Sequence, residues 1–161
     1  MRAGGLDNNR AVVNTGISPI SLIRHRHGAF RLRHKTGGLT QLQTLLDQHS
    51  FWASGRTLQE LYRMLVGSQA VVSAWHHSRL VGFGRATSDR VFRAALWDVV
   101  VAGEYRSQGL GRRLVEALLE APELVKVERV YLMTTNGAAF YEQLGFKAAD
   151  SQRLMLRTIH C

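Results

Sequence analysis

Hydrophobic residues recur along this chain in two ways, at every second position in some segments and at every third or fourth position in others. The first pattern predicts strands and the second predicts helices, because side chains alternate across a strand but return to one face of a helix about every 3.6 residues. The strand pattern occupies residues 29–36, 70–75, 80–86, 92–102, 129–135 and 153–159. The helix pattern occupies residues 39–50, 57–66, 110–121 and 137–145.

The order of these segments is β, α, α, β, β, β, α, β, α, β, which predicts a mixed sheet with helices on its faces. We therefore expect an α/β (α+β) fold. Residues 92–102 are apolar at odd and even positions alike, which is typical of a central strand covered on both faces. The polar stretch 76–79 predicts a tight turn between two strands, and Thr57 is a good N-cap for the helix that follows it.

The chain has 161 residues, enough for one domain with a hydrophobic core. Its formal net charge of +9 suggests nucleic acid as a partner, but the excess lies mainly at the start of the chain. Residues 1–36 contain seven Lys and Arg against a single acid, Asp7, whereas the other residues contain 14 against 11. We expect residues 1–28 to form a flexible basic tail and residues 29–161 to form the folded domain, with a small anion favoured over nucleic acid as ligand.

Cysteine use and hydropathy indicate where such a protein works. The one cysteine is Cys161, and no apolar run approaches the roughly 20 residues of a membrane-spanning helix. We expect a protein of a reducing compartment without membrane contact, in the cytoplasm, or in the plastid stroma if the host is a plant or alga. Residues 1–28 are either a floppy tail or a targeting segment. The seven histidines form no ligand set with cysteine or paired carboxylates, so no metal is expected.

The stretch "EYRSQGLGRRL", residues 104–114, places two glycines between a valine-rich strand and a leucine-striped helix. A dinucleotide-binding loop would need a third glycine where this chain has Leu114, and a P-loop would need Gly-Lys-Ser/Thr, which the chain lacks. A glycine turn that enters a helix can still bind an anion on free N–H groups, aided by the helix dipole and by Arg106 and Arg112. The alternative is a plain connection between strand and helix.

The segment "RSQGLG" at Arg106 to Gly111 resembles the acetyl-CoA-binding signature of the GNAT superfamily of N-acetyltransferases, which is Arg/Gln, two residues, Gly, one residue, Gly/Ala. The segment "NGAAFYEQLGFKAAD" at 136–150 is similar to a second conserved segment of that family, and the expected order of elements matches as well. The resemblance implies the GNAT fold, a mostly antiparallel sheet of six to seven strands flanked by about four helices. The stretches "GFGRATSD", "WDVVV" and "QGLG" are similar to GNATs of cyanobacteria and plant plastids, a group that includes serotonin-type arylalkylamine N-acetyltransferases.

The resemblance also implies which residues bind acetyl-CoA. The strand edge at Val99 to Val101 would pair with the pantetheine arm, and the amides from Ser107 to Arg112 would hold the pyrophosphate. A backbone N–H near Val99 or Val100 would stabilise the thioester oxygen. Asn136 would either contact the cofactor or cap the next helix. The full implied set is Val99, Val100, Val101, Arg106, Ser107, Gln108, Gly109, Leu110, Gly111, Arg112 and Asn136.

Two residues are candidates for catalysis. Tyr141 matches the family tyrosine that protonates the departing thiolate, and the alternative is an aromatic that anchors Phe140 and Phe146 in the core. Asp98, the carboxylate inside the apolar strand, is either the general base or an ion-pair partner of Arg85 or Arg93. Its strand parity is opposite to that of Trp97, which would turn it away from the substrate. A water chain to solvent is the other route for the proton.

The aromatic residues Trp97, Trp52, Phe51 and Trp75 are candidates for an aromatic-amine pocket, with the core as the alternative. The expected function is acetyl transfer from acetyl-CoA to a primary amine by direct attack, in a monomer or homodimer. The amine would be an arylalkylamine such as serotonin or tryptamine, a polyamine, or a protein lysine or N-terminus. The alternative is a non-catalytic module with a GNAT-like fold that senses acetyl-CoA or binds nucleic acid.

Overall fold

A computed structural model of the chain describes residues 12–15, 17–26 and 37–159. The strands are β1 (Val12–Thr15), β2 (Ile17–Arg26), β3 (Ala70–His76), β4 (Arg79–Ser88), β5 (Arg93–Val101) and β6 (Arg129–Tyr131). The helices are α2 (Gly38–His49), α3 (Leu58–Val66), α4 (Leu110–Leu119) and α5 (Ala138–Glu142), with a 3₁₀ turn η1 (Gly103–Tyr105).

The six strands form one sheet in the order β1-β2-β3-β4-β5-β6. Strands β1 to β5 pair antiparallel, each with the next, and short turns join most of them. Strands β5 and β6 are parallel, and the connection between them contains α4. The pairing of β5 with β6 covers only Arg93↔Arg129, Ala94↔Val130 and Ala95↔Tyr131. The mixed, mostly antiparallel sheet with four helices confirms the expected fold class.

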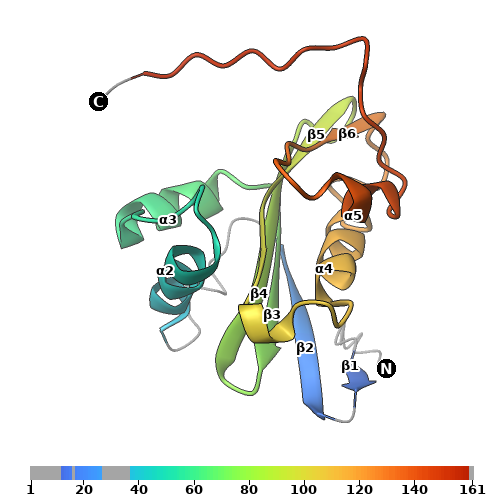
Figure 1. Ribbon diagram of the computed structural model, residues 1–161. Coiled ribbons are helices and arrows are strands. Elements are labelled where there is room, and N and C mark those ends of the chain that lie inside the picture. Colours follow the sequence, from blue (N-terminus) through green and yellow to red (C-terminus); the bar gives the residue numbers. More distant parts are fainter. Residues whose placement is uncertain (1–11, 16, 27–36, 160–161) are drawn as a thin grey trace, which may run out of the picture.

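The helices cover both faces of the sheet (Figure 1). On one face α2 packs against β4 and β5, and α3 packs against α2. On the other face α4 crosses β2, β3, β4 and β5. The leucine stripes that predicted these helices form the two core layers, with Leu42 and Leu46 buried from α2 and Leu114 and Leu118 buried from α4.

The expected N-cap at Thr57 is confirmed. The Thr57 hydroxyl accepts a bond from the Glu60 N–H at 3.2 Å, and the Glu60 carboxylate accepts from the Thr57 N–H at 2.7 Å. This reciprocal pair is a capping box, which satisfies two N–H groups at the start of the helix. The segment before α3 therefore has a defined entry angle, and that segment contributes to the site described below.

Two expectations at the chain ends differ from the structure. Residues 17–26, placed in a flexible tail, form strand β2, which pairs with β3 from Ile20↔His76 to Arg26↔Ala70 and buries Ile20 and Leu22. The basic composition of this segment did not predict a strand, because the backbone hydrogen bonds between β2 and β3 do not depend on the side chains of β2. Residues 153–159, expected to form a last strand, are extended and exposed and pair with no strand of the described sheet. The strand expected at 29–36 lies outside the described residues.

Candidate active site

Strand β5 has one edge that is only partly paired. It pairs with β4 along to Val101↔Gly82, but no strand of the described sheet pairs with its other edge beyond Ala95. The Ala102 N–H donates to the Val81 carbonyl at 2.9 Å, whereas the Val101 carbonyl accepts from Arg106 on the opposite side. Because neighbouring residues of a strand direct their backbone groups to alternate edges, Val99 and Val101 present theirs to the open edge.

The glycine turn after β5 leads into α4 with its backbone uncovered. Gly109 is the N-cap of α4 in a left-handed conformation, φ 77°, and no side chain caps the helix. A Cβ at Gly109 would meet nothing within 4 Å, so the space above this turn is open. The first-turn amides of Leu110, Gly111 and Arg112 lack intrahelical acceptors and point along the positive end of the helix dipole. The turn therefore has the features of an anion-binding helix start.

Arg106 connects this turn to two other elements. Its Nε donates to the Val101 carbonyl at 3.1 Å, and its Nη2 donates to the His49 carbonyl at 3.2 Å. His49 also accepts at Nδ1 from the Gly103 N–H at 3.3 Å. The end of α2 thus holds the start of the turn in place. Sequence reasoning missed His49, because it precedes this turn by more than 50 positions and no motif contains it.

Helix α5 packs against the start of α4. A Cβ on Gly111 would lie 3.4 Å from Phe140 Cζ and 3.8 Å from Val101 Cγ2, so position 111 faces both side chains at van der Waals distance. Arg112 Nη2 lies 3.4 Å from Gln143 Oε1 of the segment that follows α5. The open edge of β5, the first turn of α4 and α5 therefore meet at one place.

Tyr141 lies in α5, between two other aromatic rings. Its ring packs edge to face against Phe140 at 4.9 Å and Phe146 at 5.8 Å between centroids. It also lines a cavity of about 420 Å³ beside β6, together with Val130 to Thr134 and Leu154. Burial raises the pKa of the Tyr141 phenol, so the hydroxyl stays protonated through the neutral range. Both interpretations of Tyr141, a packing aromatic and a proton donor, are compatible with this position.

Asn136 does not cap α5. The N-cap is Gly137, without a side-chain cap, and the Gly137 N–H donates to Thr134 Oγ1 at 2.9 Å. The prediction of a cap is therefore wrong, because the helix begins one residue later than expected and a threonine three positions earlier takes the Gly137 amide. A cofactor contact of Asn136 remains a prediction.

Asp98 lies in β5 where the register with β4 is irregular, and its φ of 50° is unusual for a residue other than glycine. Its side chain is only 5% exposed, and Oδ2 accepts from Arg85 Nε at 2.7 Å and from Arg56 Nη1 at 3.1 Å. The expected ion pair with Arg85 is confirmed. The pair with Arg93 is wrong, because Arg93 pairs with Glu128 at 3.3 Å. Arg56, which sequence reasoning missed, comes from the connection between α2 and α3.

The bulge at Asp98 also changes which face this residue occupies. The Arg85 guanidinium lies 5.8 Å from the centre of the Trp97 ring and also binds Asp98, so Trp97 and Asp98 lie on the same side of the sheet. The prediction from strict alternation is therefore wrong at this point, because a bulge inserts an extra residue. Trp97 Nε1 donates to Thr87 Oγ1 at 2.8 Å.

The remaining aromatic candidates divide into surface and core. Trp52 is 51% exposed in the connection between α2 and α3, where its ring packs edge to face against Phe51 at 5.1 Å. Trp75 is buried, with Nε1 donating to Ser73 Oγ at 2.8 Å. Trp75 is therefore a core residue, whereas Trp52 and Phe51 are free to meet a ligand.

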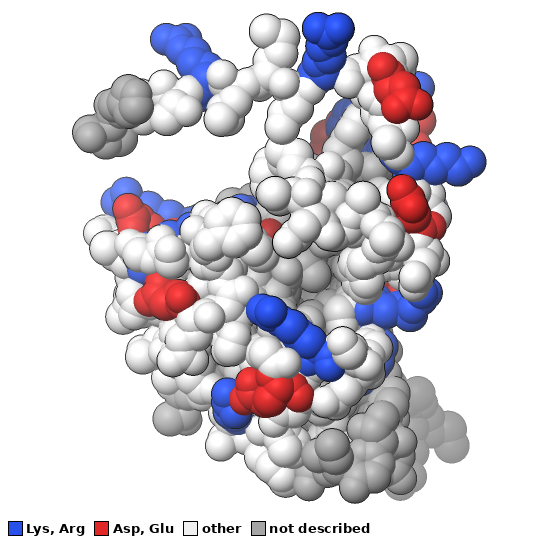
Figure 2. All heavy atoms as spheres, viewed as in Figure 1, with Lys and Arg blue, Asp and Glu red and all other residues white. Residues whose placement is uncertain are grey.

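The charges and possible metal ligands of the described residues are dispersed. Among residues 12–15, 17–26 and 37–159, no group of three or more His, Cys, Asp or Glu side chains could hold a metal ion. Within the same residues, no helix has the length and hydropathy to cross a membrane. Basic and acidic side chains alternate around a largely uncharged centre on the face shown in Figure 2.

Comparison with known proteins agrees with this geometry. The sequence profile described as the acetyltransferase (GNAT) family matches residues 39–146, which include the open edge of β5, the glycine turn and α5. An uncharacterized N-acetyltransferase, ycf52-like, from Prochlorococcus marinus is 34% identical over 117 residues, covering 70% of this chain and 64% of its own length. The chloroplastic GCN5-related N-acetyltransferase 2 of Arabidopsis thaliana is 44% identical over 71 residues, covering 44% of this chain and 28% of its own.

A solved structure shows the same arrangement of elements. A protein of Xanthomonas campestris pv. campestris assigned to the GNAT family superposes with a TM-score of 0.67 and 25% identity, over 86% of this chain and 93% of that one. The chain spans less than two thirds of the length of the first two curated relatives.

Proposed function

Because this chain belongs to the acetyltransferase (GNAT) family, we propose that it transfers an acetyl group from acetyl-CoA to a primary amine by direct attack. One observation carries the proposal. The open edge of β5, the uncapped start of α4 and the helix that bears Tyr141 meet where Gly111 faces Phe140 and Val101. That junction combines a strand edge and an anion-binding turn, and the helix packed against it bears the Tyr141 phenol.

The residues at this junction fit acetyl-CoA. The cofactor is an extended chain that ends in a pyrophosphate and an adenosine phosphate, and the junction offers an open strand edge followed by free amides. Val99 and Val101 would pair with the extended arm, and the amides of Leu110 to Arg112 would hold the pyrophosphate. When bound, acetyl-CoA supplies an acetyl group activated as a thioester.

The chain's own groups would then manage charge and protons. The Val99 N–H, directed to the open edge, would donate to the oxygen that becomes negative during transfer. Tyr141 would give its proton to the sulfur as the carbon–sulfur bond breaks, and its raised pKa keeps that proton available at neutral pH. The acceptor nitrogen forms the new bond to carbon and must lose a proton. Both arginines bind Oδ2 of Asp98, so a proton accepted by Asp98 would go to Oδ1, and a water chain is the alternative route.

We propose a small arylalkylamine as the acceptor. The half-buried Trp97 and the exposed pair Phe51 and Trp52 supply aromatic surface. Arg56, from the same connection as Phe51 and Trp52, binds Asp98, the neighbour of Trp97 in β5. The sequence resemblance to the GNAT group that includes serotonin-type arylalkylamine N-acetyltransferases favours the same choice. A protein lysine is the competing acceptor, and it would need an open groove rather than a pocket.

The experiment is a thiol-release assay with acetyl-CoA and a panel of amines that includes tryptamine, serotonin, spermidine and lysine peptides. We expect turnover that is fastest with tryptamine or serotonin. Tyr141→Phe is expected to lower kcat by about 100-fold, the usual contribution of a positioned acid, with little change in the Kd for CoA. Tyr62→Phe on α3 is the matched control and should retain the parent rate.

The outcomes separate the alternatives. Binding of CoA by calorimetry without turnover on any amine would replace the enzyme with a sensing module. Unchanged kcat in Tyr141→Phe would assign this ring to packing alone. An activity that depends on Tyr141 should also persist as the pH rises to the ordinary tyrosine range and then fall at a higher pH, because the raised pKa delays loss of the phenolic proton.

A further inference from the structure

A second cavity, of about 220 Å³, lies between α4 and the strands β2 and β3. Its lining includes Arg113, Glu116 and Ala117 of α4 and Glu120, the residue that caps the end of this helix. Successive residues of a helix are turned by about 100°, so this stripe occupies the side of α4 opposite Gly111, the residue that faces α5. The cavity is therefore separate from the junction to which acetyl-CoA is assigned.

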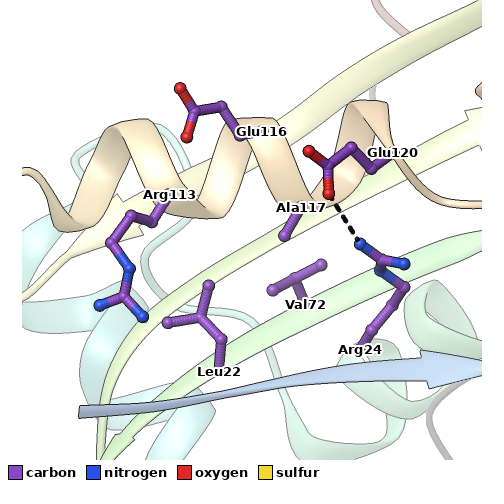
Figure 3. Close-up of a pocket in the computed structure, with 7 residues that line it drawn as sticks. All are labelled: Leu22, Arg24, Val72, Arg113, Glu116, Ala117 and Glu120. Carbon is purple, nitrogen blue, oxygen red and sulfur yellow. Dashed lines mark hydrogen bonds and ion pairs between the residues drawn. The ribbon is translucent and has the colours of Figure 1, made fainter. Parts of the chain in front are cut away.

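The floor of this cavity is apolar and two guanidinium groups border it. Leu22, Val72 and Ala117 form the floor, with Arg113 near one end and Arg24 near the other (Figure 3). Arg24 Nε and Arg113 Nη2 are buried and have no hydrogen-bond partner among the described residues. A buried N–H of a charged group without an acceptor is unfavourable, so an acceptor from a ligand would relieve both ends.

Both glutamates of the lining reach solvent, and one of them pairs with Arg24. The Glu120 side chain is 74% exposed, and its Oε2 forms an ion pair with Arg24 Nη2 at 3.5 Å, which leaves Arg24 Nε without a partner among the described residues. Glu116 is directed away from Leu22 and Val72 and pairs with Arg112 at 3.5 Å. The carboxylates therefore remain in solvent while the guanidinium groups are largely removed from it. The cavity therefore has an unpartnered guanidinium N–H at each end.

We propose that this cavity binds a short aliphatic dicarboxylate. Arg113 lies seven residues, about 10 Å along the helix axis, before Glu120, which Arg24 approaches, so the two arginines lie near opposite ends of this stretch. Each guanidinium group would donate a forked pair of bonds to one carboxylate, and the methylene groups would lie on Leu22, Val72 and Ala117. A dicarboxylate of about four or five carbons, counting the two carboxyl carbons, fits this spacing, as in succinate and glutarate.

Isothermal titration calorimetry of the full chain tests the proposal. We expect succinate or glutarate to bind, and butyrate, with one carboxylate, to bind much more weakly. Arg24→Gln and Arg113→Gln are each expected to weaken binding about tenfold or more, the effect of losing a charge-assisted bond. Arg63→Gln on α3 removes an arginine far from the cavity lining and should bind like the parent chain. Saturating CoA should leave the affinity unchanged.

Several results would overturn this assignment. Absence of heat with both dicarboxylates at millimolar concentration would do so, as would undiminished binding in folded Arg113→Gln. Competition between CoA and the dicarboxylate would show that the dicarboxylate binds at the glycine turn and not in this cavity. Binding of 1,4-diaminobutane in place of the dicarboxylates would show that the glutamates dominate. Circular dichroism checks folding, and Arg113→Lys, which keeps the charge but loses the fork, should bind with intermediate affinity.

Discussion

At the scale of single residues, Gly109 offers the sharpest test of the anion-binding turn. Gly109 and Gly55 share φ 77° and open space around a Cβ, so alanine at either position should cost about 1 kcal/mol of unfolding free energy through backbone strain. Only Gly109→Ala places a methyl group at the start of α4. We expect it to raise the Kd for CoA about tenfold, comparable to one lost phosphate bond, and Gly55→Ala to leave that Kd unchanged. Calorimetry and urea unfolding measure the two effects.

Equal affinity for CoA in both alanine variants would remove the turn from the proposed site. Equal losses of stability are part of the same expectation, because neither methyl group would meet a neighbouring atom. The comparison therefore separates strain from ligand contact.

A second prediction at this scale concerns the two arginines on Asp98. The Arg85 side chain is 14% exposed and the Arg56 side chain is 30% exposed. Arg85→Gln should cost about 3 kcal/mol, because it removes the closer partner of a buried carboxylate. Arg56→Gln should cost about 1 kcal/mol, because it leaves Arg85 in place and its charge is partly solvated. Urea unfolding of both variants measures the two losses of unfolding free energy. A larger loss for Arg56→Gln than for Arg85→Gln would contradict the prediction.

At the scale of elements, α3 depends on its capping box. Bonds from the Thr57 backbone N–H and then the Thr57 hydroxyl hold the pKa of Glu60 below its usual range. A lowered pKa contributes stability above the usual glutamate pKa, and this contribution is lost as the pH falls through the depressed value. Thr57→Ala should therefore cost about 1 kcal/mol at neutral pH and less in acid. Thr44→Ala, where the hydroxyl bonds to the Thr40 carbonyl inside α2, serves as control.

Urea unfolding at about pH 7 and about pH 3 checks this pH dependence. If the loss of unfolding free energy in Thr57→Ala stays constant or grows on acidification, the pKa of Glu60 does not depend on the Thr57 side chain. The control variant Thr44→Ala should lose the same unfolding free energy at both pH values, since the bond from the Thr44 hydroxyl to the Thr40 carbonyl involves no titrating group.

At the scale of the whole molecule, strand β2 determines where the chain can be shortened. Deletion of residues 1–28 removes the strand that pairs with β3 and the buried Ile20 and Leu22, so we expect loss of cooperative melting. Deletion of residues 1–10 leaves every described element in place and should preserve it. Circular dichroism melting measures both. A cooperative transition after deletion of 1–28 would show that β2 is dispensable.

Local patterns predicted most elements well. The leucine stripes of α2 and α4, the capping residue Thr57 and the turn between β3 and β4 all follow from residues close together in the chain. These features depend on backbone geometry and burial of one face, which a short segment specifies by itself. The positions of the glycine turn and of α5 follow from the same kind of local information.

Other features required distant residues. Arg56 reaches Asp98 across 42 positions, and Arg106 reaches the His49 carbonyl across 57. The bulge at Asp98 interrupts strict alternation, so parity counting places this carboxylate on the wrong face relative to Trp97. Likewise, β2 exists because β3 offers it an edge, which its basic composition does not reveal.

The sequence alone determined the class of fold, the glycine turn at a helix start and the position of the tyrosine within the second motif, because spacing and backbone preference act within a few residues. Only the tertiary structure decided that Val101, Gly111 and Phe140 meet, that Asp98 is bound by two arginines, and that Arg24 and Arg113 border one cavity. Those contacts arise when the sheet and its two helical layers pack, and packing joins residues that no local pattern relates.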